Sequence, residues 1–577
     1  MIGSGASLVQ AVRRAVVNVQ RPGALTGMLC TAVLASAQAQ EPYVPLVGLS
    51  SGFGGDGSQG FVLRDFRNQS LGVVVTSLGD INADGIDDIA VAQEQGEAYV
   101  LYGRDVPGGD AFGSDLNVAS LGISSDGTRG FAITYPRRYA RRLEVVVSGI
   151  GDANNDGIDD VAVGYREASP NEISRAGEVF VVYGRDGGNE PAFPPLFFVD
   201  TLFPAAGADG SEGFVVRGFV QSAGLGEGIS NAVDLNADGI NDLVVAGRQD
   251  TDRYVLFGRD STAGDTFAPV ESLKALLPEE GGDGSRGMVL ANDLFGQPTL
   301  ANAGDFNGDG VEDLLVGSAT TEDGTTGGVY LVYGRNAEAQ DGFPAVFDLT
   351  QLRQANGGDG SDGIVFFSTG DNDSIPEGLA GIGDLNGDGL DDIVIGDAFV
   401  RGREGSAYVV YGQSDPGALP ASMDVESLRA GDGTLGFILD GIEAIDEFGA
   451  AAAGIDDVNG DGIDDMLIGA PNAESYDRRF GVGNAYVIYG RDTAVDGNYP
   501  PVTDVLSLLE VQGGDGSFGT VFAGAGSNDY AGTSVSPAGD INNDGVADFI
   551  ISAPQTSPNT QEPGQAYTVY GTAPEAE

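Results

Sequence analysis

Short apolar runs recur along this chain between polar, glycine-containing turns, and they predict short β-strands throughout. Seven segments alternate Tyr or Phe with Val, Leu or Ile: AYVLYG from Ala98, VFVVYG from Val179, RYVLFG from Arg253, VYLVYG from Val329, AYVVYG from Ala407, AYVIYG from Ala485 and AYTVYG from Ala566. A period of two suits a strand in a sheet that is buried on both faces. We therefore expect one such strand in each of seven repeated units.

Three further segments accompany each of these strands. A glycine-containing apolar segment, such as Leu71–Leu78 or Phe448–Ile455, comes first in the unit, and a short apolar run, such as 392–396, comes second. The fourth strand follows a turn of the form GGDGSxGF, whose variants start at Gly54, Ser124, Gly207, Gly281, Gly357, Ala430 and Gly513. A linker with an Asp-apolar-x-x-Leu piece, as in Asp348–Leu352, joins the third strand to the fourth.

Four antiparallel strands per unit, without helical periodicity, predict a β-propeller blade, and seven units predict an all-β, seven-bladed ring. The first GGDGS turn lies before the first complete unit, whereas the last unit stops at Tyr570-Gly571, after its third strand. We therefore expect the N-terminal strand near Gly60–Leu63 to complete the last blade. Such closure removes the open sheet edges that invite aggregation.

A nine-residue motif, Asp-x-Asn-x-Asp-Gly-x-x-Asp, stands between the first and second strands of every unit. Its copies are Asp80–Asp88, Asp152–Asp160, Asp234–Asp242, Asp305–Asp313, Asp384–Asp392, Asp457–Asp465 and Asp540–Asp548, spaced by 71 to 83 residues. Calcium takes six to eight oxygen ligands, and a tight loop with oxygens at alternate positions supplies them. The glycine at position 6 permits the sharp turn.

The motif predicts up to seven calcium ions. Their ligands would be the side chains of positions 1, 3, 5 and 9 and the carbonyl of position 7, whose side chain would enter the core. The predicted ligands are Asp80, Asn82, Asp84, Ile86 and Asp88; Asp152, Asn154, Asp156, Ile158 and Asp160; Asp234, Asn236, Asp238, Ile240 and Asp242; Asp305, Asn307, Asp309, Val311 and Asp313; Asp384, Asn386, Asp388, Leu390 and Asp392; Asp457, Asn459, Asp461, Ile463 and Asp465; and Asp540, Asn542, Asp544, Val546 and Asp548.

Ordinary Asp/Asn/Gly turns are the alternative interpretation of a single copy of this motif. Retention of all five positions in seven copies favours calcium. A different calcium pattern, the glycine-rich nonapeptide GGxGxDxUx, matches once, at Gly357–Val365, without a tandem neighbour, and we interpret that segment as a turn.

Residues 1–39 predict a secretory signal peptide, and residues 40–577 the propeller. Arg13, Arg14 and Arg21 precede an apolar stretch, Ala24–Ala35, and small residues follow in Ala35–Gln40. A disordered or amphipathic leader is the alternative. The apolar stretch is too short to span a bilayer, and the rest of the sequence predicts no transmembrane span. We expect a secreted or cell-surface protein, with the periplasm as a further option.

The formal net charge is −58, and removal of the leader, which holds three arginines and no acid, makes it about −61. Such an excess argues against nucleic acid and anionic membranes as general partners, because both would repel it. The single cysteine, Cys30, lies in the leader, so the mature chain has no disulfide, and its stability must come from packing and metal.

The repeated unit resembles the FG-GAP repeat of the integrin α-subunit head. Unit six is most similar, with Phe448-Gly449 before its motif and Gly469-Ala470-Pro471 after it, whereas unit four keeps only Gly317-Ser318-Ala319. The resemblance covers nearly all of residues 44–571 and implies a seven-bladed propeller with calcium between the first and second strands of some blades. The sequence contains no inserted ligand-binding domain, so the ligands of integrin heads do not transfer.

No catalytic constellation stands out, and we do not expect an enzyme. A serine nucleophile pattern, Gly48–Gly52, occurs once, but the chain contains no histidine to accept the proton. Carboxylate pairs for glycoside cleavage are conceivable among 86 acidic residues, yet none is singled out.

One basic cluster stands out against the acidic background. It contains Arg137, Arg138, Arg141 and Arg142, and we expect Arg166 and Arg175, in the loop 165–177, to lie nearby on the rim opposite the motif. Arginine binds carboxylate and sulfate in a bidentate fork, which predicts contact with an anionic glycan or a protein. Compensation of local negative charge is the alternative.

The leading functional hypothesis is an exported, calcium-binding propeller that acts as an extracellular binding or adhesion module for a protein or glycan. The alternatives are a polysaccharide lyase or glycoside hydrolase on a propeller scaffold, and a self-associating surface or matrix protein. Neither the ligand nor the oligomeric state follows from the sequence.

Overall fold

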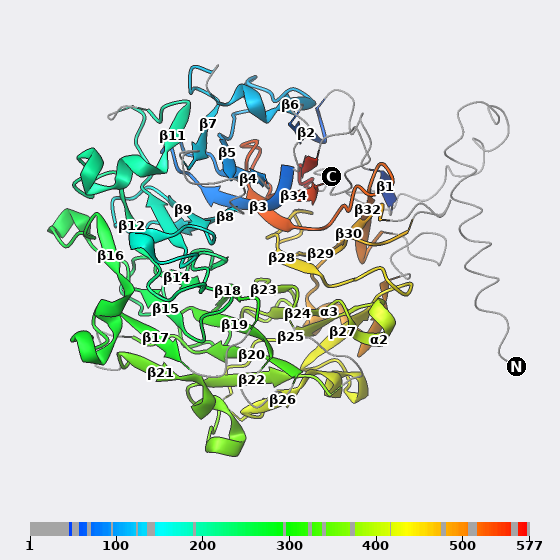
Figure 1. Ribbon diagram of the computed structural model, residues 1–577. Coiled ribbons are helices and arrows are strands. Elements are labelled where there is room, and N and C mark those ends of the chain that lie inside the picture. The colour runs from blue at the N-terminus through cyan, green and yellow to red at the C-terminus, as the bar shows by residue number, and fades with distance from the viewer. Residues whose placement is uncertain are drawn as a thin grey trace, which may run out of the picture.

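The computed structural model describes residues 46–48, 57–65, 71–93, 96–122, 125–135, 145–188, 192–291, 296–320, 326–336, 342–369, 376–415, 417–474, 481–505, 516–554 and 564–573. Seven sheets follow one another around a central axis, and the colour in Figure 1 runs once round the ring. The predicted all-β, seven-bladed propeller is confirmed. We number the blades by their copy of the nine-residue motif.

The first strand of each blade lies next to the central channel, and the second and third strands follow outward in an antiparallel meander. The first strands are β3 (Leu71–Gly79), β8 (Val145–Gly151), β13 (Gly228–Ile229), β18 (Thr299–Gly304), β23 (Leu379–Gly381), β28 (Ala451–Gly454) and β33 (Val535–Gly539). The second strands are β4 (Asp88–Gln93), β9 (Asp160–Tyr165), β14 (Leu243–Ala246), β19 (Asp313–Thr320), β24 (Ile393–Asp397), β29 (Met466–Ala470) and β34 (Asp548–Ala553).

The third strands are the alternating Tyr/Val segments of the sequence. They are β5 (Glu97–Leu101), β10 (Glu178–Val182), β15 (Arg253–Leu256), β20 (Thr326–Val332), β25 (Ser406–Val410), β30 (Asn484–Ile488) and β35 (Gln565–Val569). The fourth strands all begin at the glycine of the GGDGSxGF turn: β7 (Gly130–Thr134), β12 (Gly213–Arg217), β17 (Gly287–Ala291), β22 (Gly363–Phe367), β27 (Gly436–Asp440), β32 (Gly519–Ala523) and β2 (Gly60–Arg64).

Each sheet carries a fifth strand, which differs from the expected four. It is short, pairs in parallel with the fourth strand, and comes from the linker of the next blade, so it joins adjacent blades. The fifth strands are β11 (Leu196–Phe198), β16 (Val270–Ser272), β21 (Val346–Asp348), β26 (Ser422–Asp424), β31 (Val502–Asp504), β1 (Leu46–Gly48) and β6 (Asp115–Asn117). Three residues are too few for a visible alternation, which is why the sequence pattern did not reveal them.

Among the described residues, the helical elements are short, with three to six residues each, and lie in linkers and loops. The 3₁₀ turns are η1 (Val118–Ser120), η2 (Pro170–Glu172), η3 (Val199–Leu202), η4 (Pro204–Ala206), η5 (Ser261–Ala263), η6 (Leu273–Leu276), η7 (Pro278–Glu280), η9 (Leu349–Leu352), η10 (Gln354–Asn356) and η11 (Val425–Ala430), and the α-helical turns are α2 (Val400–Arg403) and α3 (Thr493–Asp496). The predicted Asp-apolar-x-x-Leu piece forms η9, where Asp348 caps the turn and both leucines are buried.

The ring closes through the N-terminal segment, as predicted. Strand β2 pairs antiparallel with β35, with Gly60 opposite Val569 and Val62 opposite Tyr567. Strand β1 adds a second closure, because it pairs in parallel with β32 of blade six. The N-terminal segment therefore supplies one strand to each of the last two blades (Figure 1).

Buried side chains form seven clusters, one between each pair of neighbouring blades. Alternation on the third strand explains the arrangement: Tyr99 packs between blades seven and one, whereas Val100 packs between blades one and two. Every sheet is thus covered on both faces by its neighbours. Burial of these aromatic and aliphatic side chains, rather than one central core, stabilises the ring.

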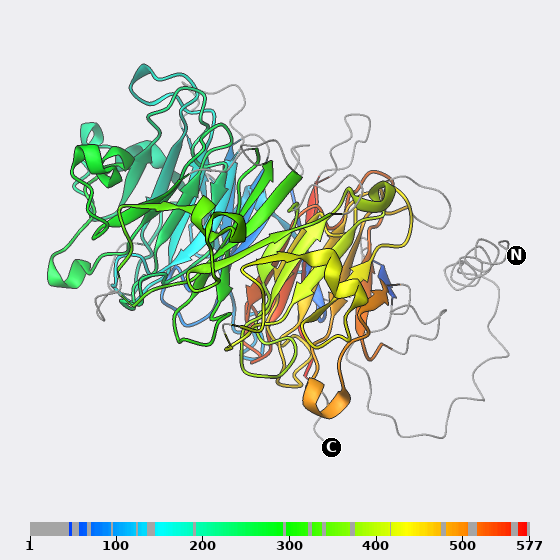
Figure 2. The same cartoon turned by 90° about the horizontal axis from the view of Figure 1, so that it is seen from below.

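The two rims of the ring carry different connections. The nine-residue motifs and the linkers between third and fourth strands meet on what we call the motif rim, where Thr493 N donates to the carbonyl of Asn386. Loops between second and third strands and the connections between blades meet on the opposite rim, where Gly224 N donates to the carbonyl of Arg175. Figure 2 shows α3 (orange) and α2 (yellow-green) at these opposite edges.

Candidate metal centres

The loop of blade one shows how the nine-residue motif folds. The carboxylate of Asp80, position 1, accepts hydrogen bonds from Asp84 N (3.0 Å) and Gly85 N (2.7 Å). Asp84, position 5, accepts from Ile86 N (3.1 Å). Gly85 has a φ of 86°, a left-handed conformation that favours glycine. The acidic residues at positions 1 and 5 therefore bend the backbone into a tight loop.

All seven copies repeat these hydrogen bonds. The bonds from position 5 N to position 1 measure 2.9–3.2 Å, those from position 6 N measure 2.7–2.8 Å, and those from position 7 N to position 5 measure 3.0–3.1 Å. One loop geometry is thus present seven times around the ring.

Position 9 is a fully buried carboxylate in every blade. Asp88 accepts a hydrogen bond from Gly103 N (2.8 Å), two residues after the third strand, and the amide of Asn82, position 3, donates to it. Burial raises the pKa of Asp88 well above its usual range, and the charges of Asp84 and Asp80 raise it further. The pKa of Asp465 is raised, mainly by burial, to about 8. A positive charge in the loop would offset this cost of burying a carboxylate.

The donor chemistry fits a hard cation. Each loop offers three carboxylates, an amide oxygen and a backbone carbonyl, which are the oxygen ligands that calcium prefers. Asn236 in blade three gives a direct indication: its side chain is buried, and its Oδ1 has no hydrogen-bond partner. A buried acceptor without a donor is costly, and a cation ligand would satisfy it. Within the described ranges, no group of three or more His, Cys, Asp or Glu side chains is placed to hold a metal.

Position 7 follows the prediction in part. Ile240 and Val311 are buried, but Ile86, Ile158, Leu390, Ile463 and Val546 are only partly buried. Each position 7 side chain lies over the glycine two residues after the third strand; Ile86 Cγ2, for example, is 2.5 Å from where a Cβ on Gly103 would stand. The side chain therefore covers that glycine at the motif rim, and in these five blades it does not enter the core.

The predicted basic site is only partly described by the structure. Arg137, Arg138, Arg141 and Arg142 lie outside the described residues. Arg166 pairs with Glu227 at 2.6 Å, and Arg175 pairs with Glu167. Arg166 and Arg175 therefore each have a carboxylate partner within the chain.

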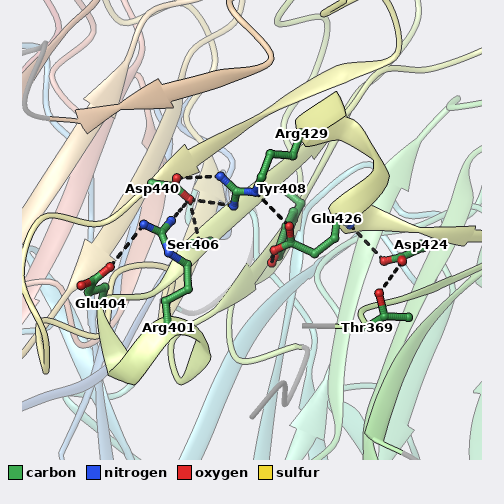
Figure 3. Close-up of polar contacts among 9 residues, drawn as sticks. All are labelled: Thr369, Arg401, Glu404, Ser406, Tyr408, Asp424, Glu426, Arg429 and Asp440. Carbon is green, nitrogen blue, oxygen red and sulfur yellow. Dashed lines mark hydrogen bonds and ion pairs between the residues drawn. The ribbon is translucent and has the colours of Figure 1, made fainter. Parts of the chain in front are cut away.

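A second polar cluster, which the sequence did not reveal, lies in blade five on the opposite rim (Figure 3). Arg401 and Arg429 both bind the carboxylate of Asp440, with Arg429 Nη1 at 2.8 Å, and Ser406 Oγ donates to the same group at 3.0 Å. Arg429 Nε also binds Glu426 at 3.0 Å. The cluster ties α2, which precedes the third strand, to η11. The linker that holds η11 begins on the motif rim but runs through β26, parallel to β22, toward the opposite rim, where β27 ends at Asp440. Residues this far apart along the chain give no local pattern.

Comparison with known families supports the repeat assignment. The FG-GAP repeat model matches residues 448–488 and 531–570, which belong to blades six and seven. The chain therefore contains FG-GAP repeats, and the predicted resemblance is confirmed. Across the described residues, no helix is long and apolar enough to cross a membrane.

Individual relatives match over part of the chain. Integrin α-4 of Xenopus laevis is 25% identical over 174 residues, 29% of this chain and 13% of that protein. Integrin α pat-2 of Caenorhabditis elegans is 28% identical over 193 residues, 33% of this chain and 13% of that protein. Phosphatidylinositol-glycan-specific phospholipase D of Rattus norvegicus is 32% identical over 124 residues, 21% of this chain and 14% of that protein. The chain thus matches only about an eighth of each of these longer relatives.

Among solved structures, the BP39L lectin of Burkholderia pseudomallei aligns over 84% of this chain and 93% of its own. Its TM-score is 0.36 and its sequence identity 13%.

Proposed function

We propose that this protein is an exported, calcium-binding FG-GAP propeller that acts as an extracellular binding or adhesion module. The observation that carries the proposal is the sevenfold loop, with the same hydrogen bonds and a fully buried carboxylate in every copy. Similarity to integrin α chains supports a binding role over a catalytic one.

Calcium is the cation that the loop chemistry favours. Position 9 would contribute a carboxylate that already accepts a hydrogen bond from the glycine N–H just after the third strand, and position 3 an amide oxygen next to it. Bound calcium would supply positive charge to carboxylates that burial otherwise disfavours. Extracellular sites of this type bind at about 10⁻⁴–10⁻³ M, so they would be occupied outside the cell.

The opposite rim is the proposed surface for a partner. Its loops differ between blades, and loops on a fixed scaffold are where binding residues concentrate. Because Arg166 and Arg175 already pair with carboxylates, the proposal for an anionic glycan or protein now depends mainly on Arg137, Arg138, Arg141 and Arg142. No described constellation favours the enzyme, and the match to a phospholipase D covers 14% of that protein.

Two measurements test the proposal. Elemental analysis of the purified mature chain should find calcium, with up to seven ions per molecule. A glycan and matrix-protein array, probed with and without calcium, should then show binding that chelator abolishes. Absence of calcium would contradict the metal assignment, and concentration-dependent light scattering without array binding would favour self-association.

A further inference from the structure

Position 8 of the motif connects neighbouring loops. At six junctions between blades, its side chain accepts a hydrogen bond from the position 1 N–H of the preceding blade. The pairs are Asp80 N to Asp159 (2.9 Å), Asp152 N to Asn241 (3.1 Å), Asp234 N to Glu312 (2.7 Å), Asp305 N to Asp391 (2.6 Å), Asp384 N to Asp464 (3.0 Å) and Asp540 N to Asp87 (2.8 Å).

The residue before position 1 is matched to this acceptor. At five of these junctions it is a glycine with φ between 59° and 67°, and a Cβ there would lie 2.1–2.3 Å from the accepting oxygen: Gly79, Gly151, Gly304, Gly383 and Gly539. At the sixth junction it is Val233, and the acceptor is the longer Glu312. Glycine is therefore required where a short acceptor packs directly over the backbone.

The junction between blades six and seven differs. Position 8 of blade seven is Ala547, which has no side-chain acceptor, and Asp456 replaces the glycine, with a φ of 53°. The two substitutions are complementary. Because Ala547 has no acceptor, there is room for the side chain of Asp456 before position 1 of blade six. The side-chain link of the other six junctions is therefore chemically absent here.

A backbone link is present at all seven junctions. In blade five, Asp392 at position 9 holds Gly412 N (2.9 Å), and the next residue, Gln413, donates its N–H to the carbonyl of Phe306 at position 2 of blade four (2.9 Å). The corresponding donors elsewhere are Arg104, Arg185, Arg259, Arg335, Arg491 and Thr572. Of these two kinds of link, blades six and seven therefore keep only the backbone one.

We propose that calcium binding in one loop favours calcium binding in the neighbouring loop through the position 8 side chain, a coupling that we call the relay. The relay is interrupted between blades six and seven. This inference rests on the proposed calcium function. Position 8 lies between the ligands at positions 7 and 9, so a filled loop would fix its side chain. That side chain in turn holds the N–H of position 1, the first ligand of the preceding loop. Such linkage makes filling of neighbouring loops mutually favourable.

Two variants of Asp391 test the relay, with Ca²⁺ alone as the probe in equilibrium dialysis. Asp391→Ala removes the acceptor, as Ala547 does naturally, whereas Asp391→Asn removes only the charge and keeps an acceptor like that of Asn241. We expect a Hill coefficient above 1 for the native chain and for Asp391→Asn. Asp391→Ala should lower it and weaken the last sites filled by on the order of fivefold.

The junction between blades six and seven allows the opposite test, in which the missing acceptor is introduced. Ala547→Asp alone should lower the melting temperature, because its carboxylate would meet the Cβ of Asp456. The double variant Asp456→Gly/Ala547→Asp should recover the melting temperature and raise the Hill coefficient above the native value. Equal Hill coefficients for Asp391→Ala and Asp391→Asn, with calcium bound, would overturn the relay alone. Absence of bound calcium in the native chain would instead overturn the proposed function.

Discussion

The motif rim is nearly the same in every blade, whereas the opposite rim differs from blade to blade. On the motif rim, seven loops repeat one set of hydrogen bonds, and neighbouring loops contact each other. On the opposite rim, the connection between second and third strands is only a few residues in blade one, 93–97, whereas blade five has α2 and a network around Asp440. A loop geometry that repeats in every blade suits a stabilising role, whereas loops that vary between blades suit recognition of a partner.

Removal of the N-terminal strands should have the largest effect. A chain that begins after Phe66 lacks β1 and β2, which leaves blades six and seven short and exposes two sheet edges. It also loses buried Phe61, Val62 and Leu63, each worth about 1.5–3 kcal/mol. Aggregation or a much lower melting temperature, relative to a chain that begins at Glu41, should follow. Equal melting temperatures would contradict the closure.

Chelation should have the second-largest effect, because it removes calcium from the loops of the motif rim. At free calcium a hundredfold above the dissociation constant, each occupied loop adds about 2.7 kcal/mol, provided that the unfolded chain does not bind. Excess chelator should therefore lower the melting temperature strongly, and added calcium should restore it. Magnesium at the same concentration serves as the control. An unchanged melting temperature in chelator would show that hydrogen bonds alone hold these loops.

Asp440→Asn should destabilise the opposite rim by about 1–3 kcal/mol, because Arg429 and Arg401 lose the carboxylate charge that they share. Burial alone would raise the pKa of Asp440, but the hydrogen bond from Arg429 and the charge of Arg401 lower it. A carboxyl group whose pKa is lower in the folded chain than in the unfolded chain stabilises the fold at pH values above its unfolded pKa. That contribution is lost as the pH falls through its folded pKa. The difference between native and variant unfolding free energies should thus shrink in acid. A constant difference would contradict the ion pairs.

Replacement of Arg137, Arg138, Arg141 and Arg142 with Ser should leave the melting temperature unchanged. Once a ligand is identified, the same variant should bind it more weakly and with a flatter dependence on salt. Normal binding at low salt would assign these arginines to charge compensation instead.

The repeating features of this protein were predictable from its sequence, and the contacts between repeats were not. Period-two alternation located the third strands, and the offset between the first GGDGS turn and the last unit located the closure. The link from Asp391 to Asp305 N depends on which blades are neighbours, and position 8 varies among Asp, Asn, Glu and Ala, so no fixed pattern exposes it. Likewise, Arg401 and Arg429 meet at Asp440 only once the strands are paired.

The pairing of β2 with β35 has a consequence for the order of folding. Gly60 finds its partner, Val569, only after the intervening blades have been synthesised, so the ring cannot close early. Contacts this distant in sequence form slowly, and until they form the edges of the last blades stay available to other chains. Completion of the molecule is therefore a single late event. A truncated or stalled chain would retain most of its blades and still lack a finished ring.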